Sequence, residues 1–507
     1  MTSNKAELEF ELLRFGRWQK IGYRIGYFFR MIPIRLWHVL CAIGRFLKMM
    51  GIKTGGYFRD LVMTFVNGTW KTRTSYAVMG MSHFTHKQYL RGVLFLGFEL
   101  AFIFYMIFAG GNWLSQIGTL GTQGAETVKD PTTGFPKTIY HDNSFKILLY
   151  SVLTIFFIVA LIYTWSLNIK QARIHQELEE DGKHIRDDKD NLRALVDRDF
   201  HRTLLALPTV GIIVFTVIPI IFMILVAFTN YDAYHQPPGK LFTWVGWDNF
   251  NELFNFGGGA SSFAATFGEI LVWTLIWAFF ATFTNYFFGM LVALLINKKG
   301  IKFKKGWRTI LVLTITIPQF ISLLYISKMF GENGIVNKAL MDWGWISKPL
   351  PFWKDAGWAR VTVIIINIWI GVPYLMLMVT GILMNIPADL YESAKIDGAS
   401  PMQQYFKITL PYMLFVTGPY LLTSFTGNMN NFNVIYLLTG GGPTNNEHFN
   451  AAGDTNLLIT WLYSTTVNQS NYALASVIGI MVFIIVGLIT VIVYNILPSN
   501  KNEDDLA

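Results

Sequence analysis

The sequence predicts an all-α polytopic membrane protein with about eight transmembrane helices, on two observations. Of its 507 residues, 52% are hydrophobic and only 14% are charged, whereas soluble domains average about 25% charged residues. Eight stretches are long and apolar enough to cross a bilayer, and polar segments separate them. The single cysteine, Cys41, excludes an internal disulfide framework and a multi-cysteine metal site.

The first 91 residues form a basic segment, with 15 Lys or Arg against four acidic residues. Arg35, Arg45 and Lys48 interrupt every apolar run before it reaches the roughly 20 residues that a span needs. Amphipathic helices on the anionic inner membrane surface explain this pattern better than nucleic-acid binding. The interleaved apolar residues include Phe28, Phe29, Leu36, Trp37, Phe46 and Leu47.

The expected spans follow this segment in order. They lie at about 92–111, 147–167, 204–229, 270–296, 307–327, 361–383, 412–427 and 474–497, and the seventh helix is expected to continue toward Leu438. We interpret 92–203 as two additional spans with a charged cytoplasmic linker, 168–203, that forms a solvated helix. Residues 204–498 would form a core of six transmembrane helices, and 499–507 a cytoplasmic tail.

The positive-inside rule orients these spans. The basic segment precedes the first span, and a second basic cluster connects the fourth span to the fifth: Lys298, Lys299, Lys302, Lys304, Lys305 and Arg308. The connection 428–472, on the opposite side, contains no Lys or Arg. We therefore expect both termini in the cytoplasm and the connections 112–146 and 230–267 outside the cell.

The polar segment 387–411, between the sixth and seventh spans, has the composition of a folded element. Pro387 suits the first turn of a helix, and Gly398 permits a reversal at its end. Ser400-Pro401-Met402-Gln403 is typical of a capping box that starts a second short helix. The orientation above puts this pair of helices in the cytoplasm. An ordinary structured loop is the alternative.

The same segment closely resembles the coupling loop of ABC importer permeases. The resemblance rests on Glu392, Ala394, Gly398, Ile408, Leu410 and Pro411. It implies that the loop fits a cleft of a separate ATPase subunit and transmits the closure of that subunit to the membrane helices. The ATPase-coupling residues would be Glu392, Ser393, Ala394, Asp397 and Gly398.

The sequence lacks the motifs of an enzyme. There is no G-x-x-x-x-G-K-[ST] motif, so ATP hydrolysis is expected in a separate subunit. The nine histidines have no metal-ligand spacing, and we expect no catalytic residue, cofactor or metal. Glu99 is the one carboxylate well inside a predicted span. It is either a proton carrier or, as we favour, a partner in a hydrogen bond to another helix.

Polar residues at membrane depth indicate a translocation path, because they are costly there. Ser424, Asn428 and Asn431 are spaced to share one face of a helix, and Asn430 and Asn433 point elsewhere. Amide groups offer donors and acceptors that match the paired hydroxyls of a sugar. Hydrogen bonding between helices is the alternative.

Neighbouring spans add to this path. Pro373 in span six frees a backbone acceptor and permits a kink, and span five has Pro318 and Ser322 at a similar depth. Phe425 and Phe432 of span seven are placed to stack on pyranose rings. Three spans with this pattern suggest a common polar path.

From about residue 204 onward the chain resembles the first permease subunit of maltose/maltodextrin importers, the MalF type. The matching residues include Trp369–Tyr374, Ser424–Phe432, Leu437–Pro443 and Ala452–Leu458. The resemblance implies sugar contacts at Ser322, Ile370, Gly371, Tyr374, Ser424, Asn428 and Asn431. It also implies a second permease subunit in a heterodimer, a homodimeric ABC ATPase and an extracellular solute-binding protein that delivers an oligosaccharide.

The sequence thus predicts the permease subunit of an ATP-driven carbohydrate importer, for maltose or maltodextrin, in a bacterial cell membrane. Two alternatives stay open. An ion-coupled secondary transporter would use Glu99 as carrier and would be favoured by an inverted repeat. A non-transporting membrane scaffold would use its intramembrane polar residues only for packing.

Overall fold

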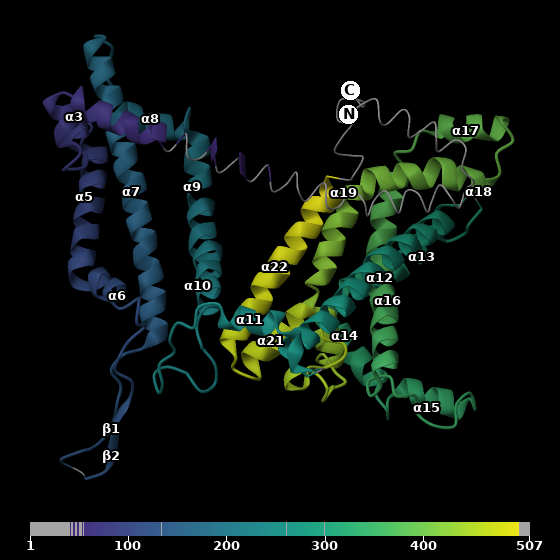
Figure 1. Ribbon diagram of the computed structural model, residues 1–507. Helices are drawn as coiled ribbons and strands as arrows, with labels where there is room; N and C mark the ends of the chain where they lie inside the picture. The colour runs from purple at the N-terminus through teal and green to yellow at the C-terminus, as the bar shows by residue number, and fades with distance from the viewer. Residues whose placement is uncertain are drawn as a thin grey trace. The chain divides into compact units, whose positions relative to one another are not determined.

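The computed structural model describes residues 41, 44–45, 48–49, 53, 55–132, 134–259, 261–298 and 300–495. The predictions for residues 1–40 and for the tail 499–507 lie outside these residues. The described chain is almost entirely helical (Figure 1). It divides into two compact units: unit 1 is Met1–Gly121 with Phe145–Phe222, and unit 2 is Thr122–Ser144 with Met223–Ala507.

Unit 1 contains long apolar helices and short polar ones. A helix covers residues 55–66, and its side chains Phe58, Val62 and Val66 are all more than half exposed. The other elements are α3 (Trp70–Thr74), α4 (Met81–Thr85), α5 (Tyr89–Tyr105), the π-helical η1 (Met106–Gly110), α6 (Gly111–Ser115), α7 (Ser144–Glu180), α8 (Asp188–Val196), α9 (Phe200–Ile212) and η2 (Ile213–Val217). Helix α10 (Ile218–Val226) crosses the boundary between the units.

Polar side chains fasten the segment before α5 to α7. The buried Asn168 of α7 accepts from the Gly80 N–H at 2.9 Å and donates to the Ser75 carbonyl at 2.8 Å. The Glu99 carboxylate accepts a hydrogen bond from the Met79 backbone N–H at 2.8 Å. Glu99 is therefore hydrogen-bonded, as we favoured, but to the turn between α3 and α4 and not to another spanning helix.

Unit 2 contains a hairpin and the helices of the predicted core. Strands β1 (Glu126–Lys129) and β2 (Pro136–Ile139) pair antiparallel, with Glu126 opposite Ile139 and Lys129 opposite Pro136. The helices are α11 (Asp248–Phe254), the 3-10 helix η3 (Phe256–Gly258), α12 (Phe263–Asn297), α13 (Lys304–Thr316), α14 (Gln319–Met329), α15 (Ile335–Asp342), α16 (Ala356–Leu383), α17 (Ala388–Ile396), α18 (Pro401–Gln404), the π-helical η4 (Tyr405–Thr409), α19 (Leu410–Met429), α20 (Phe432–Thr439), the 3-10 helix η5 (Phe449–Ala451), α21 (Leu458–Val467) and α22 (Tyr472–Tyr494).

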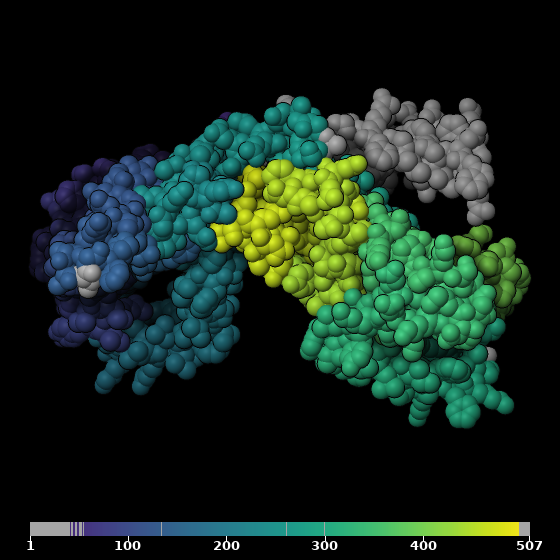
Figure 2. Space-filling view, turned by 90° about the horizontal axis from the view of Figure 1, so that it is seen from below, coloured from purple at the N-terminus to yellow at the C-terminus, as the bar shows by residue number. Residues whose placement is uncertain are grey.

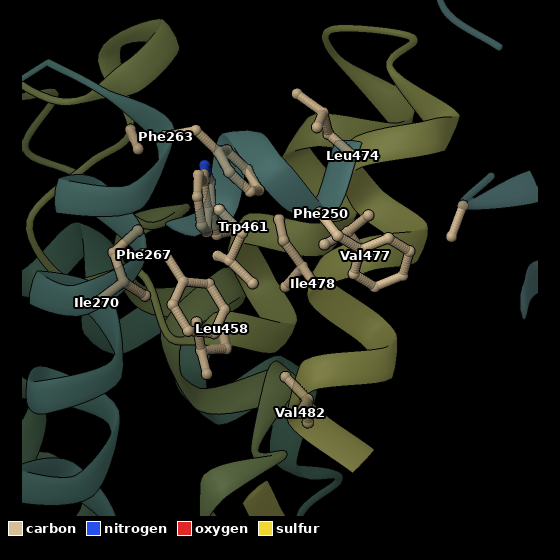
Figure 3. Close-up of a cluster of buried hydrophobic side chains, with 13 residues drawn as sticks. Phe250, Phe263, Phe267, Ile270, Leu458, Trp461, Leu474, Val477, Ile478 and Val482 are labelled. Carbon is tan, nitrogen blue, oxygen red and sulfur yellow. The ribbon is translucent and has the colours of Figure 1, made fainter. Parts of the chain in front are cut away.

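Helix α12 is the centre of unit 2, because it contributes to three separate hydrophobic clusters. Figure 3 shows the first, in which Phe263, Phe267 and Ile270 of α12 surround Trp461 of α21, and α11 and α22 close the cluster. The second joins α12 to α14, α16 and α20. The third joins it to α16 and α19. Burial of these side chains is the main favourable contribution to packing between helices that lie far apart in the sequence.

The elements of unit 2 gather at two ends. Helices α17 and α18 lie at one end of the long helices, and α11, α15 and α21 lie at the other (Figure 1). Figure 2 looks onto this second end, where α15 (green) and the connection from α20 to α21 (yellow-green) reach the surface. The long helices between the ends therefore separate two distinct faces of the unit.

The described residues contain seven continuous helices that could cross a membrane, or eight if one bent pair counts as a span. The bent pair is α13 and α14, which meet at 91° across Ile317 and Pro318. The span expected at 307–327 is therefore present only as a broken pair of helices, because α13 ends where Pro318 cannot donate and Ile317 is extended. The sequence predicts that the linker 168–203 forms one solvated helix. Instead, α7 runs to Glu180 and α8 follows as a separate helix.

Candidate functional site

Helix α16 presents three of the predicted sugar-contacting residues over little more than one turn. Ile370 packs against the second cluster, Gly371 faces α12, and the Tyr374 side chain is 54% exposed. The helix begins at its N-cap Asp355, whose carboxylate accepts from the Trp358 N–H at 2.9 Å. It continues through Pro373, which lies buried inside it.

Gly371 allows α16 and α12 to approach closely. A Cβ built at this position would collide with the side-chain amide of Asn285 on α12. Asn285 is only 7% exposed, so the amide has little room to move aside. The small residue at position 371 therefore has a packing role, whatever else it contacts.

Asn428 and Asn431 lie together and form a network with α12. The Asn428 side chain donates to the Thr282 hydroxyl at 3.0 Å, and Asn431 donates to the Asn428 side-chain oxygen at 3.3 Å. The indole N–H of Trp277 donates to the Asn428 backbone carbonyl at 3.1 Å. The hydrogen bond from Asn428 to Thr282 joins two helices, as the packing alternative predicted. It leaves one N–H of each amide for another partner.

The prediction that Ser424, Asn428 and Asn431 share one face of a single helix is wrong in part. Helix α19 ends at Met429, and Asn431 is the N-cap of α20, where its side-chain oxygen accepts from the Val434 N–H at 3.3 Å. Ser424, Asn428 and Asn431 therefore do not follow one another on a single helix. A side-chain hydrogen bond, and not helical periodicity, brings Asn431 to Asn428.

The remaining predicted contacts lie around this network. Ser424 is half-buried on α19, one turn after Tyr420. Ser322 is half-buried in α14, beside Leu323 of the second cluster. Phe432 stacks on Tyr436 with ring centroids 4.7 Å apart and meets Tyr463 edge-on. This ring is therefore already paired within the protein.

Two buried amides were missed by the sequence interpretation. The side-chain oxygen of Asn285 and the side-chain nitrogen of Asn367 are buried without a hydrogen-bond partner. Asn367 lies one turn before Gly371 on α16, and Gly371 faces Asn285. Unpaired buried polar atoms cost free energy, so they commonly indicate a missing partner. The signal in the sequence was an asparagine inside each of two apolar helices.

Helix α17 has the form that the sequence predicted. Pro387 precedes it as the N-cap, one position earlier than the first turn, and Gly398 follows with φ +75°, where a side chain would be strained. The capping box of Ser400 and Gln403 is present, with Pro401 at the first position. Of the coupling residues, Ala394 is half-buried, and the exposed ones are Glu392, Ser393, Asp397 and Gly398.

The sequence predicts a second short helix after Gly398, but the described residues show no separate helix there. Helix α18 continues through η4 into α19, so it is the first turn of a spanning helix. The Tyr391 hydroxyl of α17 shares a 2.9 Å hydrogen bond with that of Thr409, and the Gln404 side chain donates to the Ala399 carbonyl at 3.0 Å. The first contact ties α17 directly to the membrane helix, and the second ties the turn after α17 to it.

Helices α17 and α18 expose apolar side chains. Ile396 is 85% exposed, Met402 65% and Leu390 47%. Exposed groups of this kind, next to charged residues such as Glu392 and Asp397, are typical of a surface that contacts another protein.

Comparison with known proteins identifies the family of this chain. Residues 285–501 match the family of binding-protein-dependent transport system inner membrane components. The galactooligosaccharides transport system permease protein GanP of Bacillus subtilis is 33% identical over 84% of this chain and 97% of its own length. The maltodextrin transport system permease protein MalC of Streptococcus pneumoniae is 33% identical over 84% of this chain and 95% of its own length.

A solved structure of a bacterial ABC transporter involved in the import of the acidic polysaccharide alginate has a TM-score of 0.48 and 24% identity, covering 62% of this chain and 99% of the other. The two full-length relatives decide the assignment, because each is aligned over nearly its whole length. The chain belongs to the binding-protein-dependent transport system inner membrane components, and it is a multi-pass permease of the sugar ABC importer type.

Proposed function

We propose that this chain is one half of a heterodimeric permease that imports maltodextrin-type oligosaccharides. An extracellular solute-binding protein would deliver the sugar, and a homodimeric ATPase in separate chains would supply the energy. Both termini would lie in the cytoplasm, with α17 on the same side. Family membership does not support the ion-coupled alternative. Glu99, its candidate carrier, accepts a hydrogen bond from the Met79 backbone N–H.

The observation that carries the proposal is the set of incompletely paired amides on α12, α16 and α19 and at the start of α20. Asn428 and Asn431 have unused N–H groups, and Asn285 and Asn367 have unused atoms beside Gly371. A sugar hydroxyl both donates and accepts, so it can satisfy either kind of group. Tyr374 adds an exposed ring on the same helix as Gly371, suited to the apolar face of a pyranose.

Coupling to the ATPase would use α17. Its exposed Leu390 and Ile396 offer apolar contacts to a cleft, and Glu392 and Asp397 offer charged contacts around them. The Tyr391–Thr409 hydrogen bond would transmit a displacement of α17 to the helix that carries Ser424 and Asn428. One continuous segment would thus join the ATPase to the sugar path.

A galactooligosaccharide is the second candidate substrate. GanP and MalC are equally similar to this chain, and their names give different sugars. Both are neutral chains of hexoses, which the same amides and aromatic rings would suit. Competition between maltotriose and a galactooligosaccharide for uptake, in cells that carry the complete transporter, separates the two. We expect maltotriose to be taken up preferentially. If the galactooligosaccharide is taken up preferentially instead, the proposed substrate is a galactooligosaccharide.

The sugar path is tested with Tyr374→Ala, Asn428→Ala and Asn431→Ala, measured by uptake of labelled maltotriose in the complete transporter. A neutral hydrogen bond is worth about 1 kcal/mol, so each asparagine variant should lower uptake by about fivefold or more. Tyr374 is largely exposed, so its loss changes contact with the sugar without opening the protein core.

The matched control is Asn433→Ala, an exposed asparagine on α20. It should keep near-normal uptake. Equal losses at Asn433 and Asn431, or normal uptake in Tyr374→Ala, would mean that these residues only pack helices and that the sugar passes elsewhere.

A further inference from the structure

Unit 1 contains a cavity of about 440 Å³ that the transport proposal does not use. Its wall combines the start of α5, the last turns of α7, the connection 181–187, helix α8 and the start of α9. Helix α8 contacts both α5 and α9. The cavity therefore lies where three helices of spanning length are joined by polar connections.

The cavity is lined by an excess of positive charge. Arg91, Arg186, Arg198 and Arg202 line it against a single carboxylate, Asp199. That carboxylate is 3.3 Å from the Arg198 guanidinium and 3.8 Å from that of Arg202. Arg91 makes no ion pair within the described part of the chain, although Asp188 and Asp199 lie close enough to act on it. Even with Asp188 included, two carboxylates face four guanidinium groups, so positive charge is in excess.

Buried polar side chains form one wall of the cavity. Gln88 is 2% exposed and donates to the Arg186 carbonyl at 2.7 Å, which fixes the connection 181–187. Its amide nitrogen also lies 3.3 Å from Nε2 of His175, which is 7% exposed and hydrogen-bonded to Ser82. The cavity is thus built on a fixed hydrogen-bonded network.

One buried donor in this wall has no partner. Asn191 lines the cavity and is 5% exposed, and its side-chain nitrogen is buried without a hydrogen-bond partner. An unpaired buried donor is costly, and an anion that also meets arginines would satisfy it. Arginines and an unpaired donor together suit a compact group with several acceptor oxygens.

The level of the cavity along the helices identifies the source of that anion. Helix α5 begins at Tyr89 and α9 at Phe200, so Arg91 and Arg202 belong to the first turns of two spanning helices. Beyond them, Leu94 and Leu207 are 64% and 81% exposed, as lipid-facing side chains are. The cavity therefore lies at headgroup depth, next to surface that suits acyl chains.

We propose that this cavity binds the phosphate of an anionic phospholipid, held by Arg91 and its neighbouring arginines and by the Asn191 amide. The site anchors unit 1 to the anionic membrane surface. It requires nothing of the sugar path, so the two proposals fail independently.

The test uses the full chain in phosphatidylcholine nanodiscs with added phosphatidylglycerol, and binding is measured by native mass spectrometry. Arg91→Gln and Asn191→Asp should each weaken phosphatidylglycerol binding by about tenfold or more, because each removes a charge-assisted contact. Asn191→Asp keeps the shape of the side chain and adds a negative charge. Arg193→Gln is the matched control, because Arg193 lies on α8 with Asn191, is exposed and does not line the cavity.

A second arm adds inorganic phosphate to the chain in phosphatidylcholine alone and measures thermal stability. One outcome is that phosphate stabilises the wild type but not Arg91→Gln, and that phosphatidylglycerol does not bind selectively. The cavity would then bind free phosphate and not a lipid. If both variants bind phosphatidylglycerol as the wild type does and phosphate has no effect, the proposal is overturned. An equal loss in Arg193→Gln would also overturn it, because the effect would then be general charge.

Discussion

The spanning helices of the two units differ in how much protein surrounds them. In the most apolar stretches of Tyr89–Ser115 and Phe200–Val226, 6% of residues are buried within the chain, against 44% in α12 and 39% in α16. Similar apolar composition therefore serves two purposes. Helices α12 and α16 bury their side chains against each other, whereas Tyr89–Ser115 and Phe200–Val226 leave theirs for lipid or another subunit. Helix α7 of unit 1 is intermediate, with 28% buried.

The interactions that stabilise each unit internally differ accordingly. Unit 2 relies on three hydrophobic clusters around α12, with buried amides between its helices. Unit 1 relies on polar side chains at one end, such as Asn168 and Gln176, which bond the backbone of the segment before α4. Changes in unit 2 should therefore alter transport directly, and changes in unit 1 should alter stability or membrane contact.

The largest effect is expected at Gly398, in the turn after α17 that we propose contacts the ATPase. Gly398→Val puts a β-branched residue at φ +75° and should distort the turn after α17. We expect sugar uptake to fall by about tenfold or more, because α17 would no longer be correctly presented. Uptake and substrate-stimulated ATP hydrolysis by the complete transporter are the measurements. Gly487→Val, with ordinary φ and open space around it, is the control; similar losses in both would remove the special role of α17.

A smaller effect is expected at Gly371, inside unit 2. Gly371→Ala forces a Cβ against the buried Asn285 amide and should destabilise the chain by about 2–3 kcal/mol, as overpacking does. Thermal unfolding of the purified chain measures this. Gly381→Ala on the same helix meets no atom within 4 Å and should be neutral. Adding Asn285→Ala should restore part of the stability; no restoration would mean that the collision is elsewhere.

The smallest effect on transport is expected from Asn168 in unit 1. Asn168→Ala leaves the Gly80 N–H and the Ser75 carbonyl without their partner and should cost about 1–2 kcal/mol of stability. Glu179→Gln weakens the ion pair to Lys71 and the contact with the His86 ring and should cost less than about 1 kcal/mol. Uptake per assembled transporter should stay normal in both. A loss of uptake in Asn168→Ala without loss of assembly would contradict the division of roles between the units.

Local sequence signals predicted the local structure well. Apolar runs located the spanning helices, Gly398 marked a left-handed turn, and the spacing of Ser400 and Gln403 marked a capping box. Each of these features depends on residues within a few positions of one another. The break between α13 and α14 was missed although Pro318 was noted, because a proline inside an apolar run is compatible with either a kink or an end.

Features that depend on distant contacts could not be predicted. The bond between Asn428 and Thr282 joins residues 146 positions apart, and nothing near either one indicates the other. Asn285 and Asn367 likewise became candidates only when Gly371 brought α12 and α16 together. The cavity of unit 1 collects residues from Gln88 to Arg202, and its charged segment reads in sequence as a solvated surface.

The helical run from Pro401 to Thr439 can be considered as a mechanical lever. Its 39 residues would span roughly 58 Å at 1.5 Å per residue if straight, nearly twice the hydrocarbon thickness of a membrane. Helix α17 is fastened near one end through Tyr391 and Thr409. A tilt of about 10° at that end would move the other by roughly 10 Å. The Asn430–Asn431 break divides this arm into a long and a short segment, so the same rotation would also change the angle between them.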